Sequence, residues 1–332
     1  MNKKLIKIYQ EIEKNRNSKV LAYVTGDRVN METQIASDVV DIFGKHLETI
    51  GKTKKITLIL YTLGGDTMAT WNIVNLIREY CNELEIIVPR KARSSGTIMC
   101  LGANEIILTH QSTLGPIDPS INSPLGTKVK LNNQEITLPT SVESVKGYFN
   151  LAKKELGIKS SKDLIQAFIK LSDTLNPLLI GDVYRRQGQI KMIANKLLDY
   201  QNCTKKKKQS IVDFLCSDSG SHDYTISYTE AKQLGLNVSL ADDTLNNLVN
   251  QWYDIISEEL LLKTPYNPLM ELAQQNEKSY EYIRVILDSI LYGREQFVSK
   301  GTLQKIIMQI GVPNIQVNDN RIFEGWEKDV KK

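Results

Sequence analysis

Apolar residues follow a helical period at the start of the chain and a strand-like pattern directly after it. Over residues 3–15 they recur every three or four positions, which predicts an amphipathic helix. The apolar positions are Leu5, Ile8, Tyr9 and Ile12. Three largely apolar runs follow, at 19–25, 55–62 and 84–89. Such runs are typical of strands that are covered on both faces, as in a parallel sheet.

Helical patterns lie between these predicted strands, at 31–50 and directly after Asp66, and a further strand is predicted at 105–109. Strands that alternate with helices over short connections form βαβ units. The expected fold class is therefore α/β, with a parallel sheet covered by helices. Asp66 is expected to cap the helix that follows it, because a short carboxylate side chain accepts hydrogen bonds from the first free N–H groups.

The pattern changes in the middle of the chain. Residues 127–138 predict a hairpin with its turn at Asn132 and Asn133, and residues 142–200 have a helical pattern. A last strand is expected at 234–238. Everything after Asp242 reads as helical, so we expect a helical C-terminal extension, and the prolines near residue 265 indicate its boundary.

Composition narrows the functional classes. The chain has 332 residues, of which 41% are hydrophobic and 24% charged, with a net charge of +4. These values exclude a disordered chain and do not suggest nucleic-acid binding. The four cysteines form no CxxC pair, which argues against a disulfide scaffold or a zinc site. No apolar run approaches 18 residues, and the first segment lacks the apolar core of a secretory signal, so we expect a cytoplasmic protein without a membrane span.

Two glycine-bearing turns carry the candidate chemistry. Each lies between a predicted strand and a predicted helix, one at 62–66 and the other at 93–97. In parallel α/β folds, sites gather at the carboxyl ends of strands, and glycine lets backbone N–H groups approach a ligand closely. A serine at such a turn, with N–H groups directed at one point, is how an acyl-transfer site is built. Each turn taken alone also fits an ordinary tight turn, and neither matches a phosphate-binding loop.

Together, the two turns resemble those of the Clp-type serine peptidases in the crotonase-like superfold. That family has a Gly-Gly turn, then about 29 residues later a serine, one variable residue and a glycine. Here Ser94 follows Gly65 by 29 residues, and Ser94-Ser95-Gly96 fits the serine motif. Segments 102–118 and 219–238 also resemble the family. Within them, the GPID stretch (115–118) and the SGSHD stretch (219–223) resemble best the serine dehydrogenase proteinase (SDH) group, which is related to signal peptide peptidase A.

The resemblance covers residues 18–245 well and the rest more loosely. It implies a ClpP/crotonase-like core of repeated ββα units. We therefore expect an N-terminal helix at 1–17, a peptidase domain at 18–262 and the helical C-terminal extension at 263–332.

The resemblance also implies roles at the candidate site. Ser94 would be the nucleophile of a serine endopeptidase, and the backbone N–H groups of Gly65 and Ser95 would form the oxyanion hole. A peptide or protein substrate and self-assembly into a homo-oligomer are implied as partners. No metal and no organic cofactor are implied.

Three assignments of the general base stay open, because the sequence departs from the family there. The family's histidine position falls on Asp118, and its aspartate position falls on Asp223. In the first assignment His222 is the base, oriented by one of these two acids. In the second, Lys146 forms a dyad with the nucleophile, which requires a desolvated, neutral lysine. In the third, no competent base exists and the site is inert.

Each base candidate also has a purely structural interpretation. His222 lies in a segment rich in Ser, Gly and Asp, which suits a surface turn, and Asp118 could simply hold a turn. Lys146 fits a solvated helix position. Of the other histidines, His46 is expected on a helix surface and His110 in a loop.

Two further functional classes remain. An acyl-CoA enzyme on the same superfold would use the oxyanion hole without a nucleophile. A catalytically inert scaffold or regulatory protein would keep only the fold.

Overall fold

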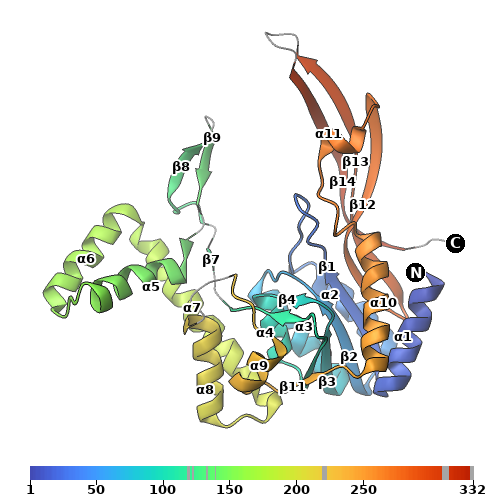
Figure 1. Cartoon of the computed structure of the whole chain (residues 1–332), viewed down its shortest axis with the longest axis horizontal. Helices are drawn as coiled ribbons and strands as arrows, with labels where there is room; N and C mark the ends of the chain where they lie inside the picture. The colour runs from blue at the N-terminus through green and yellow to red at the C-terminus, as the bar shows by residue number, and fades with distance from the viewer. Residues whose placement is uncertain are drawn as a thin grey trace. The chain divides into compact units, whose positions relative to one another are not determined.

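The computed structural model describes residues 1–117, 120–121, 123–131, 134–138, 140–218, 223–308 and 314–329. The chain forms two compact units (Figure 1). The first unit joins Met1–Leu114 to Ser227–Lys332, and the second comprises Gly115–Ile226. The predicted division at residues 17/18 and 262/263 stays a prediction. Within the described residues, no helix is both long and apolar enough to cross a membrane.

An eight-stranded mixed sheet organises the first unit, in the order β11-β5-β3-β2-β1-β12-β13-β14. Its first five strands run parallel to one another. Their bounds are β1 Lys19–Thr25, β2 Thr53–Tyr61, β3 Cys81–Val88, β5 Glu105–Leu108 and β11 Val238–Leu240. Two short strands, β4 (Lys91–Ala92) and β6 (Thr113–Leu114), pair with each other beside this sheet. The parallel part of the sheet confirms the predicted α/β class.

The remaining three strands of the sheet are long and antiparallel: β12 Glu277–Ser289, β13 Gly293–Met308 and β14 Asn314–Lys328. The expected helical C-terminal extension is therefore wrong: among its described residues, only the short segment α11 (Pro268–Leu272) is helical. The physical reason is the edge of the parallel sheet. Six of the seven residues of β1 are buried, and β12 supplies the backbone partners that β1 needs on its free side. The strand expected as the last one, at 234–238, overlaps β11 only at Val238. β11 lies at one edge of the sheet, and three more strands follow it along the chain.

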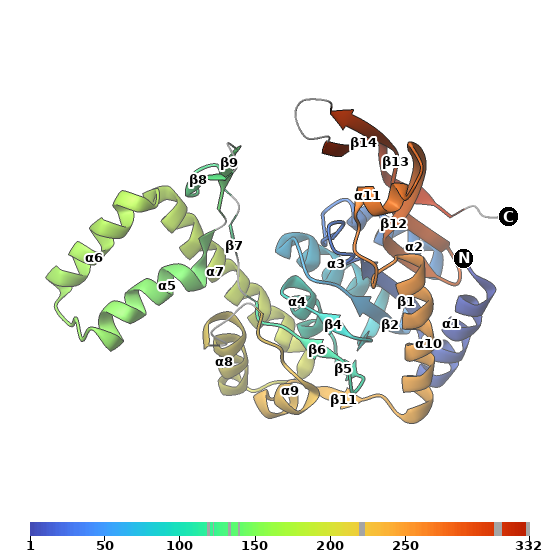
Figure 2. The same ribbon diagram turned by 45° about the horizontal axis from the view of Figure 1, so that its top comes forward.

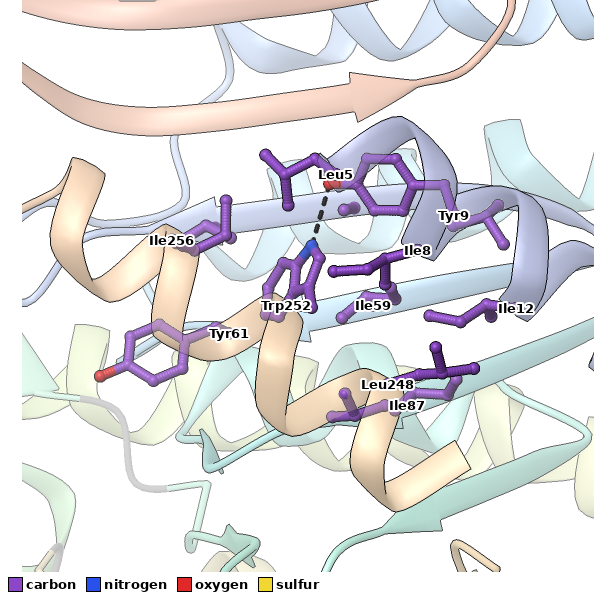
Figure 3. Packing of buried hydrophobic residues seen from close by; sticks show 14 of the residues in the cluster. Leu5, Ile8, Tyr9, Ile12, Ile59, Tyr61, Ile87, Leu248, Trp252 and Ile256 are labelled. Atoms are coloured by element: carbon purple, nitrogen blue, oxygen red, sulfur yellow. Dashed lines mark hydrogen bonds between the residues drawn. The ribbon is translucent and has the colours of Figure 1, made fainter. Parts of the chain in front are cut away.

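Helices cover both faces of the sheet. Helices α1 (Lys3–Arg16) and α10 (Asp243–Glu259) lie side by side on one face (Figure 1). Side chains from both helices meet residues of β2 and β3 there (Figure 3). On this face the indole Nε1 of Trp252 donates to the Tyr9 hydroxyl over 2.9 Å. The predicted buried stripe of the first helix is confirmed.

The opposite face packs against α2 (Val39–Ile50). Successive side chains of a strand point to opposite faces, and the neighbours of Tyr23 in β1 face α1 and α10, so Tyr23 faces the other way. Its ring meets the Phe43 ring of α2 edge-on, with the ring centroids 5.2 Å apart. His46 of the same helix is fully buried, so its expected surface position is wrong. The helix also begins later than the pattern at 31–50 predicts. The other helices of the first unit are α3 Thr67–Tyr80, α4 Ser95–Leu101 and α9 Tyr228–Leu234.

The second unit is mainly helical (Figure 2). It begins with two short strand pairs: β7 (Ser120–Ile121) with β10 (Thr140–Ser141), and β8 (Lys128–Leu131) with β9 (Gln134–Thr137). The predicted hairpin is thus confirmed, while its turn at 132–133 lies outside the described residues. The helices that follow are α5 Val142–Asn150, η1 Leu151–Glu155, α6 Ser161–Thr174, α7 Pro177–Leu197, η2 Leu198–Gln201, α8 Lys205–Asp213 and η3 Phe214–Asp218.

Candidate active site

The Gly-Gly turn follows β2 and precedes α3. Asp66 caps α3 as predicted, because its Oδ1 accepts from the backbone N–H groups of Met68 at 2.7 Å and Ala69 at 2.9 Å. Gly64 and Gly65 have φ angles of +103° and +145°, which L side chains rarely adopt. The turn therefore requires glycine at both positions for its backbone path.

A segment far from this turn in sequence holds it by its backbone. The N–H of Ile35 donates to the Gly64 carbonyl, and the Ile35 carbonyl accepts from the Asp66 N–H, both over 2.8 Å. A Cβ on Gly65 would lie 2.3 Å from the Ile35 oxygen, so only glycine permits this approach. Ile35 was not predicted to take part, since its contribution comes from its main chain and no side-chain pattern reports it.

The serine turn lies between β4 and α4. Ser94 has φ +48° and ψ −113°, a sparsely populated conformation for a residue with a side chain. The strand before it and the helix after it hold this geometry: the Gly96 N–H donates to the Arg93 carbonyl over 2.7 Å, and the Thr97 hydroxyl donates to the Ala92 carbonyl over 3.0 Å. A serine on a sharp strand-to-helix turn is the arrangement that exposes a nucleophile at the end of a sheet.

The two turns are in direct contact. Thr62 and the strand before Ser94 exchange backbone hydrogen bonds, from the Thr62 N–H to the Lys91 carbonyl at 3.2 Å and from the Arg93 N–H to the Thr62 carbonyl at 3.0 Å. A Cβ on Gly64 would lie 2.7 Å from the Arg93 oxygen and 3.0 Å from the Ser94 Cβ. The structure therefore brings the Gly-Gly turn and the nucleophile candidate together, as their resemblance to a family site implies.

Ser95 ties the turns together with its side chain. Its buried hydroxyl donates to the Gly65 carbonyl over 2.6 Å. This hydroxyl is thus occupied in a structural contact, whereas Ser94 is only half-buried and makes no capping hydrogen bond with its side chain. Of the two adjacent serines, Ser95 is therefore the one whose hydroxyl holds the turns together.

Two backbone donors are available beside the serine. In the part of the chain that the structure describes, neither the Gly65 N–H nor the Ser95 N–H donates to a protein acceptor. Unused N–H groups that flank a serine are what an oxyanion hole requires. Because the two turns are in contact, both N–H groups belong to the same region of the first unit.

The structure does not join the base candidates to this site. His222 and Asp118 lie outside the described residues. Asp223 is exposed and Lys146 is half-buried on α5, and both belong to the second unit. The choice among the three base assignments therefore stays a prediction.

The thiol nearest to the serine turn in sequence is that of Cys100. The described residues contain no group of His, Cys, Asp or Glu that could hold a metal ion. Cys100, on α4, is fully buried, and this burial raises the pKa of its thiol, so the thiol stays protonated and unreactive.

Comparison with known proteins supports the resemblance. Residues 1–137, which include both turns, match the family of ClpP-like SDH-type serine proteinases. The predicted resemblance to the SDH-type proteinases is therefore confirmed. The core of this chain has the ClpP/crotonase-like fold. The matched residues end before Lys146 and His222, so the match carries the turns and leaves the base open.

Individual relatives are distant. Two uncharacterized proteins of Methanocaldococcus jannaschii are 25% and 22% identical over 240 and 243 residues, which cover 70% and 71% of this chain and 72% of each relative. Among solved structures, a membrane-bound stomatin-specific protease is similar in two mutant forms, one of them in complex with a substrate peptide. The first form is 18% identical and covers 71% of this chain and 84% of its own, with a TM-score of 0.37. The second form is 19% identical and covers 68% of this chain and 77% of its own, with a TM-score of 0.38.

Proposed function

We propose that the chain is a serine endopeptidase that hydrolyses peptide bonds through Ser94. The observation that carries this proposal is the position of Ser94, held at a strained φ of +48° directly against the Gly64–Gly65 turn. Backbone strain of this kind persists only where the surrounding structure enforces it, and it concentrates at functional sites. The match of residues 1–137 to a family of serine proteinases supports the same reaction.

The proposed reaction is acyl transfer. The Ser94 Oγ attacks the carbonyl carbon of the scissile peptide bond and passes its proton to a base, which then protonates the leaving amine. The negative charge that develops on the carbonyl oxygen accepts hydrogen bonds from the N–H groups of Gly65 and Ser95. One such donor stabilises the transition state by about 3–4 kcal/mol in serine hydrolases. Water then hydrolyses the acyl-enzyme and restores the hydroxyl.

The base remains a choice between His222, oriented by Asp118 or Asp223, and Lys146. The two assignments predict different pH dependence. With a histidine base, the enzyme loses activity as the imidazole is protonated, which for an ordinary imidazole occurs near pH 6.5. With a lysine base, activity is lost as the amine is protonated. We also propose a homo-oligomer, on the resemblance alone.

Hydrolysis of a fluorogenic peptide mixture tests the proposal. We expect turnover by the wild type, none by Ser94→Ala, and loss in only one of His222→Ala and Lys146→Ala. Ser227→Ala, a serine at the start of α9, is the matched control and retains full activity. Turnover of an acyl-CoA thioester that survives Ser94→Ala would instead favour an acyl-CoA enzyme, and a folded but inert wild type would favour a scaffold.

A further inference from the structure

The first unit has a groove that none of the residues of the two turns lines. It is a groove of about 390 Å³, within the range of small-ligand sites. One wall is the segment 32–38, and the other is formed by β12, β13 and β14. We refer to it as the Trp326 groove. The residues that line it are Tyr23, Glu32, Thr33, Gln34, Ala36, Asp38, Arg284, Val285, Phe297, Glu324 and Trp326.

The groove contains three aromatic residues. Tyr23 is fully buried, and the rings of Phe297 and Trp326 meet edge-on with centroids 5.8 Å apart. The Trp326 indole Nε1 donates to Asp38 Oδ2 over 2.8 Å, which fixes the orientation of this ring. A fixed indole beside a carboxylate is a favourable environment for an organic cation, because the ring face and the carboxylate both attract positive charge.

The single cation of the groove is used internally. Arg284 donates from Nε to the Met31 carbonyl over 3.2 Å and from Nη2 to the Glu32 carbonyl over 2.8 Å. Its Nη1 contacts Ser299 and forms an ion pair with Glu324. The guanidinium therefore crosslinks the two walls and has little capacity left for an anionic ligand.

The acids of the groove are not fully compensated. Glu324 is paired with Arg284 and Arg321, but Glu32 and Asp38 form no ion pair with any described residue. Both are exposed at the rim. The groove thus combines fixed aromatic rings with more acidic than basic lining residues, a balance that favours a cationic ligand over an anionic one.

We propose that the Trp326 groove binds the guanidinium or ammonium group of an arginine or lysine side chain in a peptide. The alkyl stem of such a side chain would lie along the aromatic rings, and its charged end would meet Asp38 and Glu32. None of the residues that line the groove belongs to the Gly-Gly turn or to the serine turn.

The groove is nevertheless linked to the oxyanion hole. Gln34 and Ala36 line it, and the residue between them, Ile35, holds Gly64 and Asp66 by two backbone hydrogen bonds of 2.8 Å. A basic side chain bound in the groove would therefore contact the segment that positions Gly65. The proposal that the bound side chain belongs to a peptide substrate rests on the proposed function, whereas the proposal that the groove binds a cation does not.

A matched pair of ligands tests the proposal. N-acetyl-arginine amide and N-acetyl-citrulline amide have nearly the same shape and differ in charge. We would titrate each into the full chain carrying Ser94→Ala, which prevents turnover, and follow tryptophan fluorescence. We expect the arginine ligand to bind about tenfold more tightly than citrulline, and the fluorescence change to disappear in Trp326→Phe.

Two variants separate charge from shape. Asp38→Asn keeps an acceptor for the Trp326 indole but removes the charge, and we expect it to weaken arginine binding about three- to tenfold with citrulline binding unchanged. Glu48→Gln, at an exposed position of α2, is the control and changes neither. Equal affinity for the two ligands, no saturable binding, or an Asp38→Asn variant with unaltered arginine affinity would overturn the proposal. Arginine binding by a chain without peptidase activity would leave the cation site standing and refute only the proposed function.

Discussion

The strained conformation of Ser94 makes a prediction about stability that is independent of any substrate. A residue with a Cβ at φ +48° and ψ −113° costs about 1–3 kcal/mol relative to an ordinary conformation, and glycine avoids this cost. Ser94→Gly should therefore be more stable than Ser94→Ala. Both variants lose the hydroxyl, so the comparison isolates the backbone.

Glycine and alanine also differ in ways unrelated to strain. Glycine is more flexible in the unfolded chain, which costs about 0.4–1 kcal/mol, and it is a better helix N-cap than alanine. Ser227, the N-cap of α9, has an ordinary φ of −76° and provides the matched control in the same unit. The Gly-minus-Ala difference in unfolding free energy should be larger at Ser94 than at Ser227 by about 1–3 kcal/mol.

Urea unfolding measures this difference. With a shared slope of about 3 kcal/mol per molar urea, the predicted free energy corresponds to a midpoint shift of about 0.3–1 M. Equal Gly-minus-Ala differences at the two positions would show that Ser94 is not strained. The surrounding fold would then not hold this serine in a strained conformation.

Three other perturbations follow from the same contacts. Ser95→Ala removes the hydroxyl that donates to the Gly65 carbonyl over 2.6 Å, so we expect a loss of about 1–3 kcal/mol in unfolding free energy and reduced peptide turnover, measured by urea unfolding and the fluorogenic assay. Gly96→Ala would place a Cβ 2.4 Å from the Thr62 Cγ2 and should lower the unfolding free energy by about 1–3 kcal/mol. Thr62→Ser removes that methyl group, so the double variant should recover much of the lost stability. Purely additive effects of the two substitutions would contradict the contact. Burial lowers the pKa of His46 to about 3, so between that pH and about 6.5 the unfolded chain binds a proton that the folded chain does not. Stability should therefore fall with falling pH by up to about 1.4 kcal/mol per unit in this window, and His46→Gln should remove this part of the slope in pH-dependent unfolding; an unchanged slope would refute it.

Local patterns predicted the elements that carry the turns. The first helix, the parallel strands and the cap at Asp66 are each encoded within a few neighbouring residues, and all three are confirmed. The spacing from Gly65 to Ser94 located the two turns. The two turns come into contact because β2 and β3 are neighbours in a parallel sheet, so that the segments after both strands leave the sheet at the same edge.

Tertiary contacts overrode the patterns elsewhere. The segment before Val39 was predicted as helix, but the backbone of Ile35 pairs with the Gly-Gly turn and cannot also form helical hydrogen bonds. The C-terminal segment was read as helical although Tyr280 and Tyr282 alternate with polar residues, as expected of a strand. The glycine at position 293 is the turn signal in the sequence that could have corrected this interpretation, and in the structure it is the first residue of β13, with a φ of +101°.

The general base illustrates a different limit of prediction from sequence. Ser94 and the proposed oxyanion donors depend on backbone geometry within one unit, whereas Lys146, Asp223 and His222 belong to the other part of the chain. Chain spacing does not determine which of them reaches the serine. Only a reaction, or the loss of one, can assign that role.

Covalent labelling with a fluorophosphonate probe tests the central claim most directly. The probe reacts with activated serines, and peptide mass spectrometry distinguishes an adduct on Ser94 from one on its neighbour Ser95. We predict a single adduct on Ser94 in the folded wild type, abolished by Ser94→Ala and retained in Ser227→Ala. An adduct on Ser95, or a folded chain that stays unlabelled across a broad pH range, would contradict the account.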